Sequence, residues 1–371
     1  MSFAFVKTAF FRNLFDEEID VRGKDVFFTG ENGQGKTNFL EALYFCSYAS
    51  SFRGVKDRDL VKTGEKNCSV FVSLENSIHE KVNVSFREGK KSINLDGKRV
   101  EDRKELLSVA PCIVFCHEDM EFVAGAPERR RWFFDQTRSL WDPLYLDDLR
   151  KYRHVLKTRN SFFRKDGINR PRLTPEITAM LDVLDPQMAH YGLELKRKRQ
   201  KLAQEFTRVF QPLYEAISGI GGIGVSYIPS WKNDDLQKIM DHLGERREAD
   251  LSFGVSLSGQ HRDRYVFTCN GEDFSGKAST GQRRLLALLL RLAQAAVFLE
   301  KTGKKPILLL DDVLLELDGE KRQKFLSVMP DYEQAFFTFL SGEYERYLKP
   351  DTIVYSMESG KARRKVHGNS A

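Results

Sequence analysis

The chain has 371 residues, a length that predicts two compact units, or one large unit with an inserted lobe. Of its residues, 41% are hydrophobic and 30% are charged, a balance typical of a globular protein. Its formal net charge of +6 permits an acidic partner such as nucleic acid without requiring one. The first residues do not resemble a secretory signal and the longest apolar stretch is too short to cross a bilayer, so we expect a cytosolic protein without a membrane partner.

The first third of the chain is rich in apolar and alternating stretches, which predict β-strands. We expect strands at 2–10, 15–21 and 26–28, a helix after the third of these, a meander of three or four antiparallel strands over 68–96, a helix at about 101–108 and a buried strand at 112–116. The five cysteines, two of them on this last strand, complete no zinc-ligand pattern and are expected to be buried free thiols.

The middle of the chain, from residue 128 to 233, has a mainly helical pattern. Its first part, residues 128–172, carries thirteen Lys or Arg against six Asp or Glu, and Pro171 and Pro175 interrupt the helical pattern. A long helix is predicted at 186–210, a strand at 225–228 and a further helix at 234–249. We therefore expect an inserted, mainly helical lobe over 123–249.

The last part of the chain returns to alternating strands and helices. We expect a hairpin at 265–269 with its turn at 270–271, an apolar helix at 283–299, a buried strand at 306–312, a helix at 319–328, and strands at 335–338 and 352–355. The polar residues after Gly360 are predicted to be disordered. Residues 1–122 and 250–371 are together expected to form one α/β head built from both chain ends.

The stretch from Gly30 to Thr37 fits the phosphate-binding pattern G-x-x-x-x-G-K-[ST] and lies between a predicted strand and a predicted helix. Its glycines let backbone N–H groups surround a phosphate, and the helix N-terminus adds a partial positive charge. Lys36 would reach the β- and γ-phosphates, and the Thr37 hydroxyl would hold Mg²⁺. The alternative, a Gly-rich turn that binds nothing, is much less favoured with these flanks. The predicted ATP contacts are Gly30, Glu31, Asn32, Gly33, Gln34, Gly35, Lys36, Thr37 and Asn38.

A second element is the run from Ile307 to Asp312, four apolar residues followed by two carboxylates. Open α/β sheets bind ligands at the carboxyl ends of their strands, so we expect these carboxylates beside the P-loop. Asp311 would hold Mg²⁺, and Asp312 would polarise the attacking water. Asp312 and Lys36 are both predicted to be catalytic. The alternative is a buried strand that merely ends in a polar turn, and the pairing with a P-loop favours the nucleotide site.

The third element is the segment from Ser279 to Gln282, directly before an apolar helix. It resembles the signature of ABC-type ATPases. This resemblance implies that Ser279, Gly281 and Gln282 bind the γ-phosphate held by the other subunit's P-loop, with Ser279 among the catalytic residues. A helix N-terminus attracts anions, which agrees with such a role. The same residues also fit a capping box, with Ser279 as N-cap and Gln282 at the third helical position, and both roles can hold together.

The spacing of the motifs discriminates among ABC-type proteins. From Lys36 to Asp311 the chain advances by 275 residues (311 − 36). ABC transporter ATPases are similar in motif order but keep these motifs much closer together. SMC-type proteins separate them by long coiled coils, whereas the insert here is short and interrupted by Pro and Gly.

Further short motifs make the chain similar to the RecF family over nearly its whole length. They are Phe11-Arg12-Asn13, Ser51-Phe52-Arg53, Asp59-Leu60-Val61 with Gly64, Glu118-Asp119, the run 125–131 with Phe134-Asp135, the run 259–263, and the run 309–313 with Glu316-Leu317-Asp318. The chain departs from the family's pattern at His117, Gln260, Arg264 and Leu315, and none of these departures removes a predicted phosphate or metal group.

The resemblance implies an α/β fold, an ABC-type P-loop ATPase head formed by both chain ends with the helical lobe inserted. It implies that ATP and Mg²⁺ join two subunits head to head, and that this homodimer clamps single- and double-stranded DNA at gaps. It also implies partnership with RecO and RecR, help in loading RecA during recombinational repair and replication recovery, and slow DNA-stimulated hydrolysis. Asp312 lies where ABC ATPases usually carry Glu, and its shorter side chain agrees with slow turnover.

Basic side chains of the lobe are the candidates for contact with DNA phosphates. They are Arg129, Arg130, Arg131, Lys196, Arg197, Lys198, Arg199 and Lys201. For any single one of them a solvated helix face is the commoner explanation, and Arg130 is also a candidate for a role in the fold or a dimer interface. No pattern indicates base reading, so DNA binding should be insensitive to sequence and should weaken with salt.

Two other classes of function remain open at this point. One is a small-molecule kinase, against which the signature and the basic lobe argue. The other is an ATPase subunit that drives a membrane partner, against which the motif spacing argues. ATP-induced dimerisation and DNA-stimulated hydrolysis would separate the DNA clamp from both.

Overall fold

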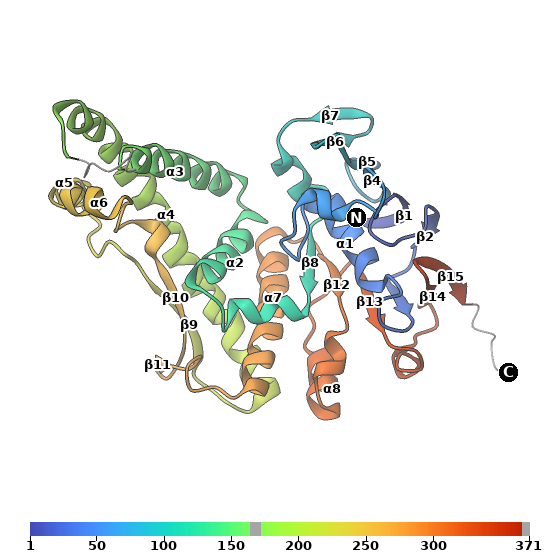
Figure 1. Ribbon diagram of the computed structural model, residues 1–371. Helices are drawn as coiled ribbons and strands as arrows, with labels where there is room; N and C mark the ends of the chain where they lie inside the picture. Colours follow the sequence, from blue (N-terminus) through green and yellow to red (C-terminus); the bar gives the residue numbers. More distant parts are fainter. Residues whose placement is uncertain (164–171, 366–371) are drawn as a thin grey trace. The chain divides into compact units, whose positions relative to one another are not determined.

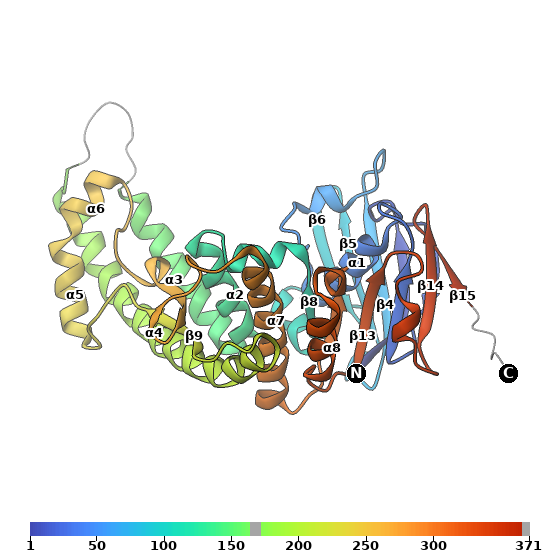
Figure 2. The same cartoon turned by 90° about the horizontal axis from the view of Figure 1, so that it is seen from below.

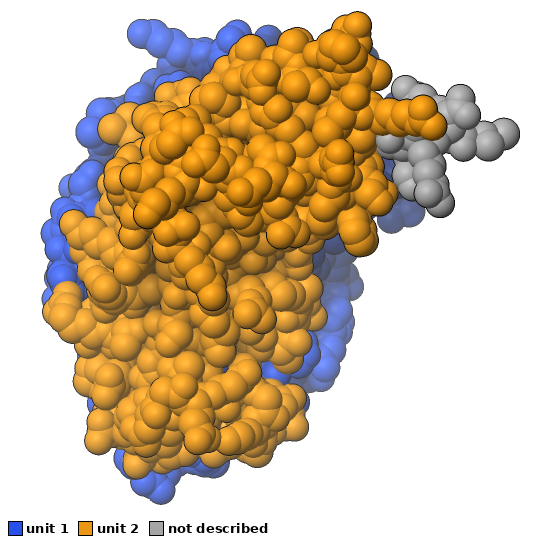
Figure 3. All heavy atoms as spheres, turned by 90° about the vertical axis from the view of Figure 1, so that its left-hand side faces the viewer, with its two compact units in different colours: residues 1–120, 284–371 blue, residues 121–283 orange. Residues whose placement is uncertain are grey.

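The computed structural model describes residues 1–163 and 172–365, and the chain divides into two compact units (Figure 1, Figure 3). Unit 1 consists of residues 1–120 and 284–371, so it is built from both chain ends, and unit 2 consists of residues 121–283. The lobe expected over 123–249 therefore ends earlier than unit 2. The reason is that strand β10 (Arg264–Cys269) pairs along its whole length with β9 (Ile223–Ile228), which ties it to the helical lobe.

One sheet of unit 1 is antiparallel, with the strand order β2-β1-β4-β5-β6-β7. Its strands are β1 (Ser2–Ala9), β2 (Glu18–Asp20), β4 (Cys68–Glu75), β5 (Lys81–Arg87), β6 (Lys90–Leu95) and β7 (Lys98–Val100). Buried and partly exposed residues alternate along β4, and its buried Val70 and Val72 lie opposite Val84 and Val82 of β5. This alternation gives the sheet one apolar face. The predicted meander is confirmed.

The second sheet of unit 1 has the order β15-β14-β3-β13-β12-β8. Its parallel strands are β3 (Asp25–Thr29), β8 (Cys112–Phe115), β12 (Ile307–Leu310), β13 (Gln334–Phe339) and β14 (Ile353–Glu358). Four of these strands, β3, β13, β12 and the edge strand β8, are buried at every residue, as expected for parallel strands covered on both faces. Because β13 pairs in parallel with both β3 and β12, the carboxyl ends of these three strands lie at one edge of the sheet.

Helix α1 (Lys36–Tyr48) follows β3 and contacts strands of both sheets, so it lies between them (Figure 1). Eleven of its residues are buried, which explains why its sequence is apolar nearly all round. The other helices of this unit are α8 (Gly319–Ser327) and most of α7 (Thr280–Thr302), whose first residues belong to unit 2. The helix predicted at 101–108 is instead a 3₁₀ segment, Arg103–Ser108.

The polar residues directly after Gly360 are ordered, contrary to the prediction. They form β15 (Lys361–Lys365), which pairs antiparallel with β14. Ser359 and Gly360 make the turn with φ values of 50° and 81°, the left-handed pair that suits a tight hairpin. The sequence pattern missed this strand because main-chain pairing at a sheet edge holds it, while its basic side chains are largely exposed. Residues 366–371 of the predicted tail lie outside the described residues.

Unit 2 is mainly helical. Its elements are α2 (Pro127–Ser139), α3 (Pro143–Ser161), α4 (Pro175–Ser218), α5 (Leu236–Glu245), α6 (Arg247–Phe253), β9, β10 and β11 (Glu272–Asp273). Helix α3 packs along α4 (Figure 1, Figure 2). The predicted hairpin is confirmed by β10 and β11, and the single helix expected at 234–249 is divided into α5 and α6.

Helix α4 is longer than the predicted helix at 186–210. It has 44 residues and includes Pro186 and Pro212 in its interior. Pro175 begins the helix instead of breaking it, because an N–H at the first position has no helical partner to lose, and the Thr174 side chain caps the N–H of Ile177. The predicted break at Pro171 lies outside the described residues.

Two expectations from composition concern the whole chain. The five cysteines are free, and four of them are buried. Among the helices that the structure describes, none is long and apolar enough to cross a membrane.

Candidate nucleotide-binding site

The P-loop connects β3 to α1, so the predicted strand–loop–helix context is present. Gly30, Gly33 and Gly35 have φ values of 154°, 80° and 106°, which residues with side chains rarely adopt. A Cβ atom at Gly30 would also lie 2.6 Å from the carbonyl oxygen of Met357 on β14. Glycine is therefore needed both for the path of the loop and for the close approach of the neighbouring strand.

Lys36 and Thr37 are the first two residues of α1. The Lys36 side chain is 4% exposed, and its ammonium donates to the carbonyl oxygens of Gly30 at 2.7 Å and Glu31 at 3.2 Å. The Thr37 hydroxyl donates to Oδ1 of Asp311 at 2.8 Å. This contact brings the P-loop and the carboxylate motif together at the sheet edge, as the strand pattern predicted.

Thr338 completes the group at this edge, and sequence reasoning missed it. Its hydroxyl lies 3.0 Å from Oδ1 of both Asp311 and Asp312, and it accepts a hydrogen bond of 2.8 Å from the backbone N–H of Asp312. Thr338 lies near the end of β13, between β3 and β12. A polar residue directly after the apolar run 335–337 was the signal that would have found it.

The Asp311 carboxyl suits a hard cation. Burial raises its pKa to about 6, the nearby Asp312 carboxylate adds to this rise, and the hydrogen bond from Thr37 opposes it. A divalent cation would favour the ionised form. Two carboxylates and two hydroxyl groups offer the oxygen ligands that Mg²⁺ prefers alongside substrate phosphates. The described residues hold no cluster of three or more His, Cys, Asp or Glu side chains that would form an all-protein metal cage.

The β14–β15 turn holds the middle of the P-loop. The Gln34 side chain accepts from the Ser359 N–H at 2.6 Å, and its carbonyl accepts from the Gly360 N–H at 3.0 Å. On the other side, the Asn13 amide donates to the carbonyl of Gly33 at 3.0 Å. These contacts involve groups that local sequence patterns did not assign to the site, because the partners come from the two chain ends.

Two of the family motifs meet on a buried carboxylate of α1. Glu41 is fully buried and accepts from Arg12 Nε at 2.8 Å and from the Ser51 hydroxyl. Arg53 donates to the side chain of Asn38 at 3.1 Å. Arg12, Ser51 and Arg53 thus secure the helix that carries the P-loop.

The segment from Ser279 to Gln282 forms the capping box that the sequence allowed. The Ser279 N–H donates to Gln282 Oε1 at 2.8 Å, and the Gln282 N–H donates to Ser279 Oγ at 3.2 Å. Ser279 and Gly281 are nevertheless exposed at the start of α7. An exposed helix N-terminus stays accessible to an anion, so the cap is compatible with the signature role.

Three of the basic candidates are buried. Arg199 is 3% exposed and faces the carboxylates of Asp135 and Asp263. Lys196, also 3% exposed, pairs with Asp234 at 2.8 Å. Arg131 donates to the carbonyl of Asp263 and to the Glu128 carboxylate. For Arg199, burial argues against a contact with DNA, because reaching a phosphate would leave the buried carboxylates of Asp135 and Asp263 unpaired. Lys196 is itself buried, but its carboxylate partner Asp234 is exposed.

The remaining candidates differ in accessibility. Arg130 is half-buried and donates to the carbonyls of Val123 and Tyr265, which agrees with its alternative role in the fold. Lys198 is partly exposed and pairs with Asp148. The exposed candidates are Arg129, Arg197 and Lys201.

The chain is similar to proteins of one family over nearly its whole length. The model of the RecF/RecN/SMC N terminal domain matches residues 5–355. The DNA replication and repair protein RecF of Treponema pallidum is 42% identical over 353 residues, which cover 94% of this chain and 97% of that protein. The chain belongs to the RecF family. Another member, the RecF of Clostridium tetani, is 29% identical over 96% of this chain and 98% of that protein.

Solved structures agree with the RecF assignment. A structure described as the recombination mediator protein RecF with ATP in the RecFOR pathway has a TM-score of 0.86 and 26% identity, over 98% of this chain and 97% of that one. The Smc head domain of Pyrococcus furiosus has a TM-score of 0.54 and 16% identity over 98% and 95% of the chains, and shares the fold alone. The α/β fold is thus that of an ABC-type ATPase head, as predicted.

Proposed function

We propose that the chain is an ATP-dependent DNA-binding protein of recombinational repair and replication recovery. The observation that carries this proposal is the 2.8 Å hydrogen bond from Thr37 to Asp311, which joins two nucleotide-site motifs 274 residues apart. The similar RecF structure with ATP supports ATP as the nucleotide. The relatives named DNA replication and repair protein support the process.

The P-loop residues would bind and orient the nucleotide. Lys36 donates to two backbone carbonyls, which phosphate oxygens can replace because they are stronger acceptors. Thr37 and Asp311 would hold Mg²⁺, which supplies positive charge to the phosphates. Asp312 would orient the attacking water, and Thr338 holds both carboxylates in position. Asp312 is one methylene shorter than Glu, which agrees with slow turnover.

The signature would act across a dimer. Ser279, Gly281 and Gln282 would bind the γ-phosphate of the other subunit, so ATP would join two subunits head to head. The homodimer would clamp DNA through exposed cations, of which Arg129, Arg197 and Lys201 are the accessible candidates. RecO and RecR are the proposed partners, with RecA loading as the outcome, since the similar structures are described as belonging to the RecFOR pathway.

The first test is sedimentation with ATP and Mg²⁺, with and without gapped duplex DNA, on the parent and on Lys36→Met. We expect only the parent to dimerise with ATP and then retain DNA, and we expect DNA to stimulate its hydrolysis. A parent that stays monomeric and ignores DNA would contradict the proposal. The search would then turn to small-molecule phosphate acceptors.

Mixing two variants tests whether each nucleotide site combines the P-loop of one subunit with the signature of the other. Ser279→Asp keeps a good N-cap but places a negative charge where the γ-phosphate would lie, so we expect normal thermal stability and hydrolysis lowered by about 100-fold. Mixing Ser279→Asp with Lys36→Met should restore hydrolysis, because the mixed dimer has one P-loop and one facing signature intact. If Ser279→Asp hydrolyses ATP like the parent, the segment is a helix cap only.

A further inference from the structure

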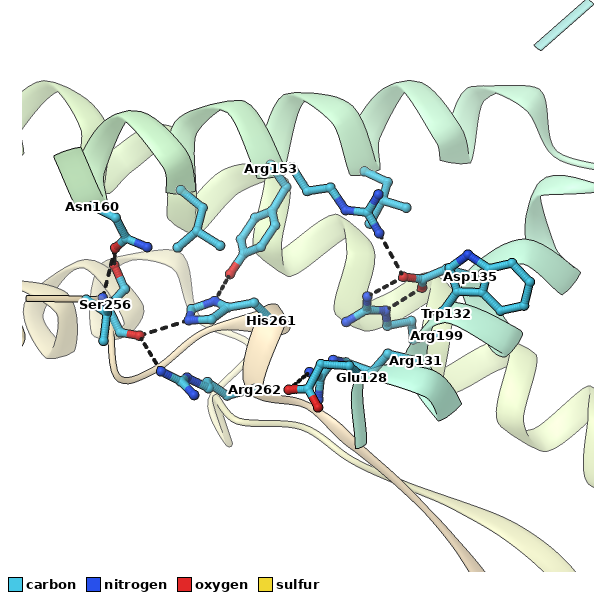
Figure 4. Close-up of a pocket in the computed structure, with 14 residues that line it drawn as sticks. Glu128, Arg131, Trp132, Asp135, Arg153, Asn160, Arg199, Ser256, His261 and Arg262 are labelled. Carbon is cyan, nitrogen blue, oxygen red and sulfur yellow. Dashed lines mark hydrogen bonds and ion pairs between the residues drawn. The ribbon is translucent and has the colours of Figure 1, made fainter. Parts of the chain in front are cut away.

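A cleft of about 380 Å³ opens within unit 2 (Figure 4). Two motif segments that the nucleotide site does not use, 125–135 and 259–263, meet at this cleft although they are far apart in sequence. Helix α3, Arg199 of α4 and the residues Val255 and Ser256 supply the rest of the wall. The residues that line the cleft are Glu128, Arg131, Trp132, Asp135, Leu149, Tyr152, Arg153, Leu156, Asn160, Arg199, Val255, Ser256, His261 and Arg262.

The cleft carries more cations than anions. Its four arginines face the carboxylates of Glu128 and Asp135 in the lining and that of Asp263 behind Arg199, which leaves an excess of one positive charge (4 − 3). Glu128 is engaged by Arg131 at 2.8 Å, and Asp135 by Arg199 at 2.9 Å. The carboxylates are thus satisfied by the two buried arginines of the cleft.

The other two arginines are accessible to a ligand. The Arg153 side chain is 60% exposed and makes only a long ion pair of 3.9 Å with Asp135, beyond hydrogen-bond distance. Arg262 is exposed and donates only a long bond of 3.4 Å to the carbonyl of Ser256, with no ion pair to a carboxylate of the described residues. Figure 4 shows Arg153 extending from the helix on one side and Arg262 from the opposite segment.

A flat aromatic surface lines the same cleft. Trp132 is 39% exposed, and its ring stacks on that of Phe122 with a centroid distance of 5.8 Å and an interplanar angle of 25°. This contact fixes the indole plane from one side. Leu156 and Val255 add apolar surface to the same cleft. A ligand for this site therefore combines a flat apolar group with a negatively charged group.

We propose that this cleft binds one unpaired nucleotide of single-stranded DNA, with its base against Trp132 and its phosphate between Arg153 and Arg262. Guanidinium groups match phosphate oxygens, and indole rings stack on any base, so binding would not depend on sequence. The volume suits a single nucleotide and is too small for a duplex. An acidic peptide would satisfy the cations, but it does not require the fixed indole plane. The inference rests on the proposed function and assigns the unpaired strand of its DNA to unit 2.

The test measures the binding of an oligothymidylate of eight nucleotides without ATP, so that the ATP-dependent dimer does not form. We expect Trp132→Leu, Arg153→Gln and Arg262→Gln each to weaken binding about tenfold, and each arginine variant to lower the salt dependence of binding by about one ion. The control is Arg150→Gln, which removes the same charge from α3 outside the cleft and should change affinity less than twofold. The oligonucleotide should also quench tryptophan fluorescence in the parent but much less in Trp132→Leu.

Two results would overturn the inference. One is unchanged oligothymidylate affinity in both arginine variants, which are exposed and should fold normally. The other is full displacement of the oligonucleotide by an acidic, aromatic-containing peptide that binds more tightly, which would assign the cleft to a protein partner.

ATP-dependent dimerisation and duplex retention are measured on the same variants. If dimerisation and duplex retention persist while the substitutions leave oligonucleotide binding unchanged, only the assignment of the cleft fails. If the parent does not dimerise but binds the oligonucleotide through Trp132, only the clamp fails.

Discussion

The nucleotide-binding edge of unit 1 and the buried ion network of unit 2 both use cationic and acidic side chains, but these side chains have different partners in the two places. At the sheet edge, Lys36 and Asp311 contact backbone carbonyls and hydroxyl groups. In unit 2, each of two buried arginines contacts two carboxylates. Arg159 pairs with Asp185 at 2.7 Å and Asp250 at 2.6 Å, and Arg199 pairs with Asp135 and Asp263.

This difference separates binding groups from structural ones. Neutral partners can be exchanged for a ligand at little cost, because no charge is left unpaired. A buried arginine between two carboxylates cannot leave them without stranding charges in a poorly solvated interior. The partners of a charged residue, rather than its type, therefore indicate whether it serves a ligand or the fold.

The largest effect should come from breaking the buried network. Arg199→Met would leave Asp135 and Asp263 without their shared cation, so we expect a loss of about 4 kcal/mol in the free energy of unfolding. Arg197→Met, two positions earlier on the same helix and exposed, should change it by less than about 0.5 kcal/mol. Urea unfolding of both variants measures this. Equal stability losses would contradict the structural role of Arg199.

The turn that supports the P-loop gives the next largest effect. A Cβ atom at Gly360 would lie 1.9 Å from the backbone oxygen of Asn13, so Gly360→Ala should cost about 3 kcal/mol and weaken ATP binding. Gly89→Ala is the matched control, because Gly89 has a similar φ of 79° but no atom within 4 Å of its Cβ position. It should cost only about 1 kcal/mol of conformational strain and leave ATP affinity unchanged. Thermal unfolding and nucleotide titration would distinguish the two costs.

A partly buried histidine of unit 2, His261, should make stability depend on pH. Burial lowers the pKa of His261 from 6.5 to about 4, with the charges of Arg262 and Arg131 adding to this and the Ser256 carbonyl opposing it. Because the folded pKa lies below the unfolded one, the unfolded chain binds more protons between these values. Stability is therefore full above pH 6.5 and falls as the pH drops toward 4, by about 2 kcal/mol at pH 5.

His261→Asn removes the titrating group and isolates this contribution. The difference in unfolding free energy between the parent and His261→Asn should shrink on going from pH 7.5 to pH 5. A difference that stays constant with pH would show that His261 titrates equally in both states.

The smallest effect concerns the length of the Asp312 side chain, which carries one carboxylate of the nucleotide site. Asp312→Glu would carry the carboxylate one methylene closer to the attacking water, so we expect ATP turnover to rise about fivefold, near 1 kcal/mol in the barrier. The loss of the Thr338 hydrogen bond should lower stability by about 1 kcal/mol. Steady-state hydrolysis with DNA present measures the first effect, and unchanged turnover would count against the assigned role of Asp312.

The sequence by itself determined the parts of the nucleotide site that depend on local geometry. The spacing of glycines before Lys36 sets the backbone path of the loop, and four apolar residues before Asp311 specify a buried strand whose end lies at the sheet edge. Both motif strands belong to one parallel sheet, with β13 between them, so their carboxyl ends lie at the same edge. For the same reason the capping box at Ser279 was visible in four consecutive residues.

Only the tertiary structure decided which charges are buried and which distant segments meet. Nothing near Arg199 in sequence indicates that Asp135 and Asp263 close around it, because they lie on other elements. The order of β15 and the membership of β10 in unit 2 likewise depend on main-chain pairing with remote strands. Burial and pairing are properties of the packed chain, so a pattern of residue types specifies local elements but leaves the partners of each charge to the fold.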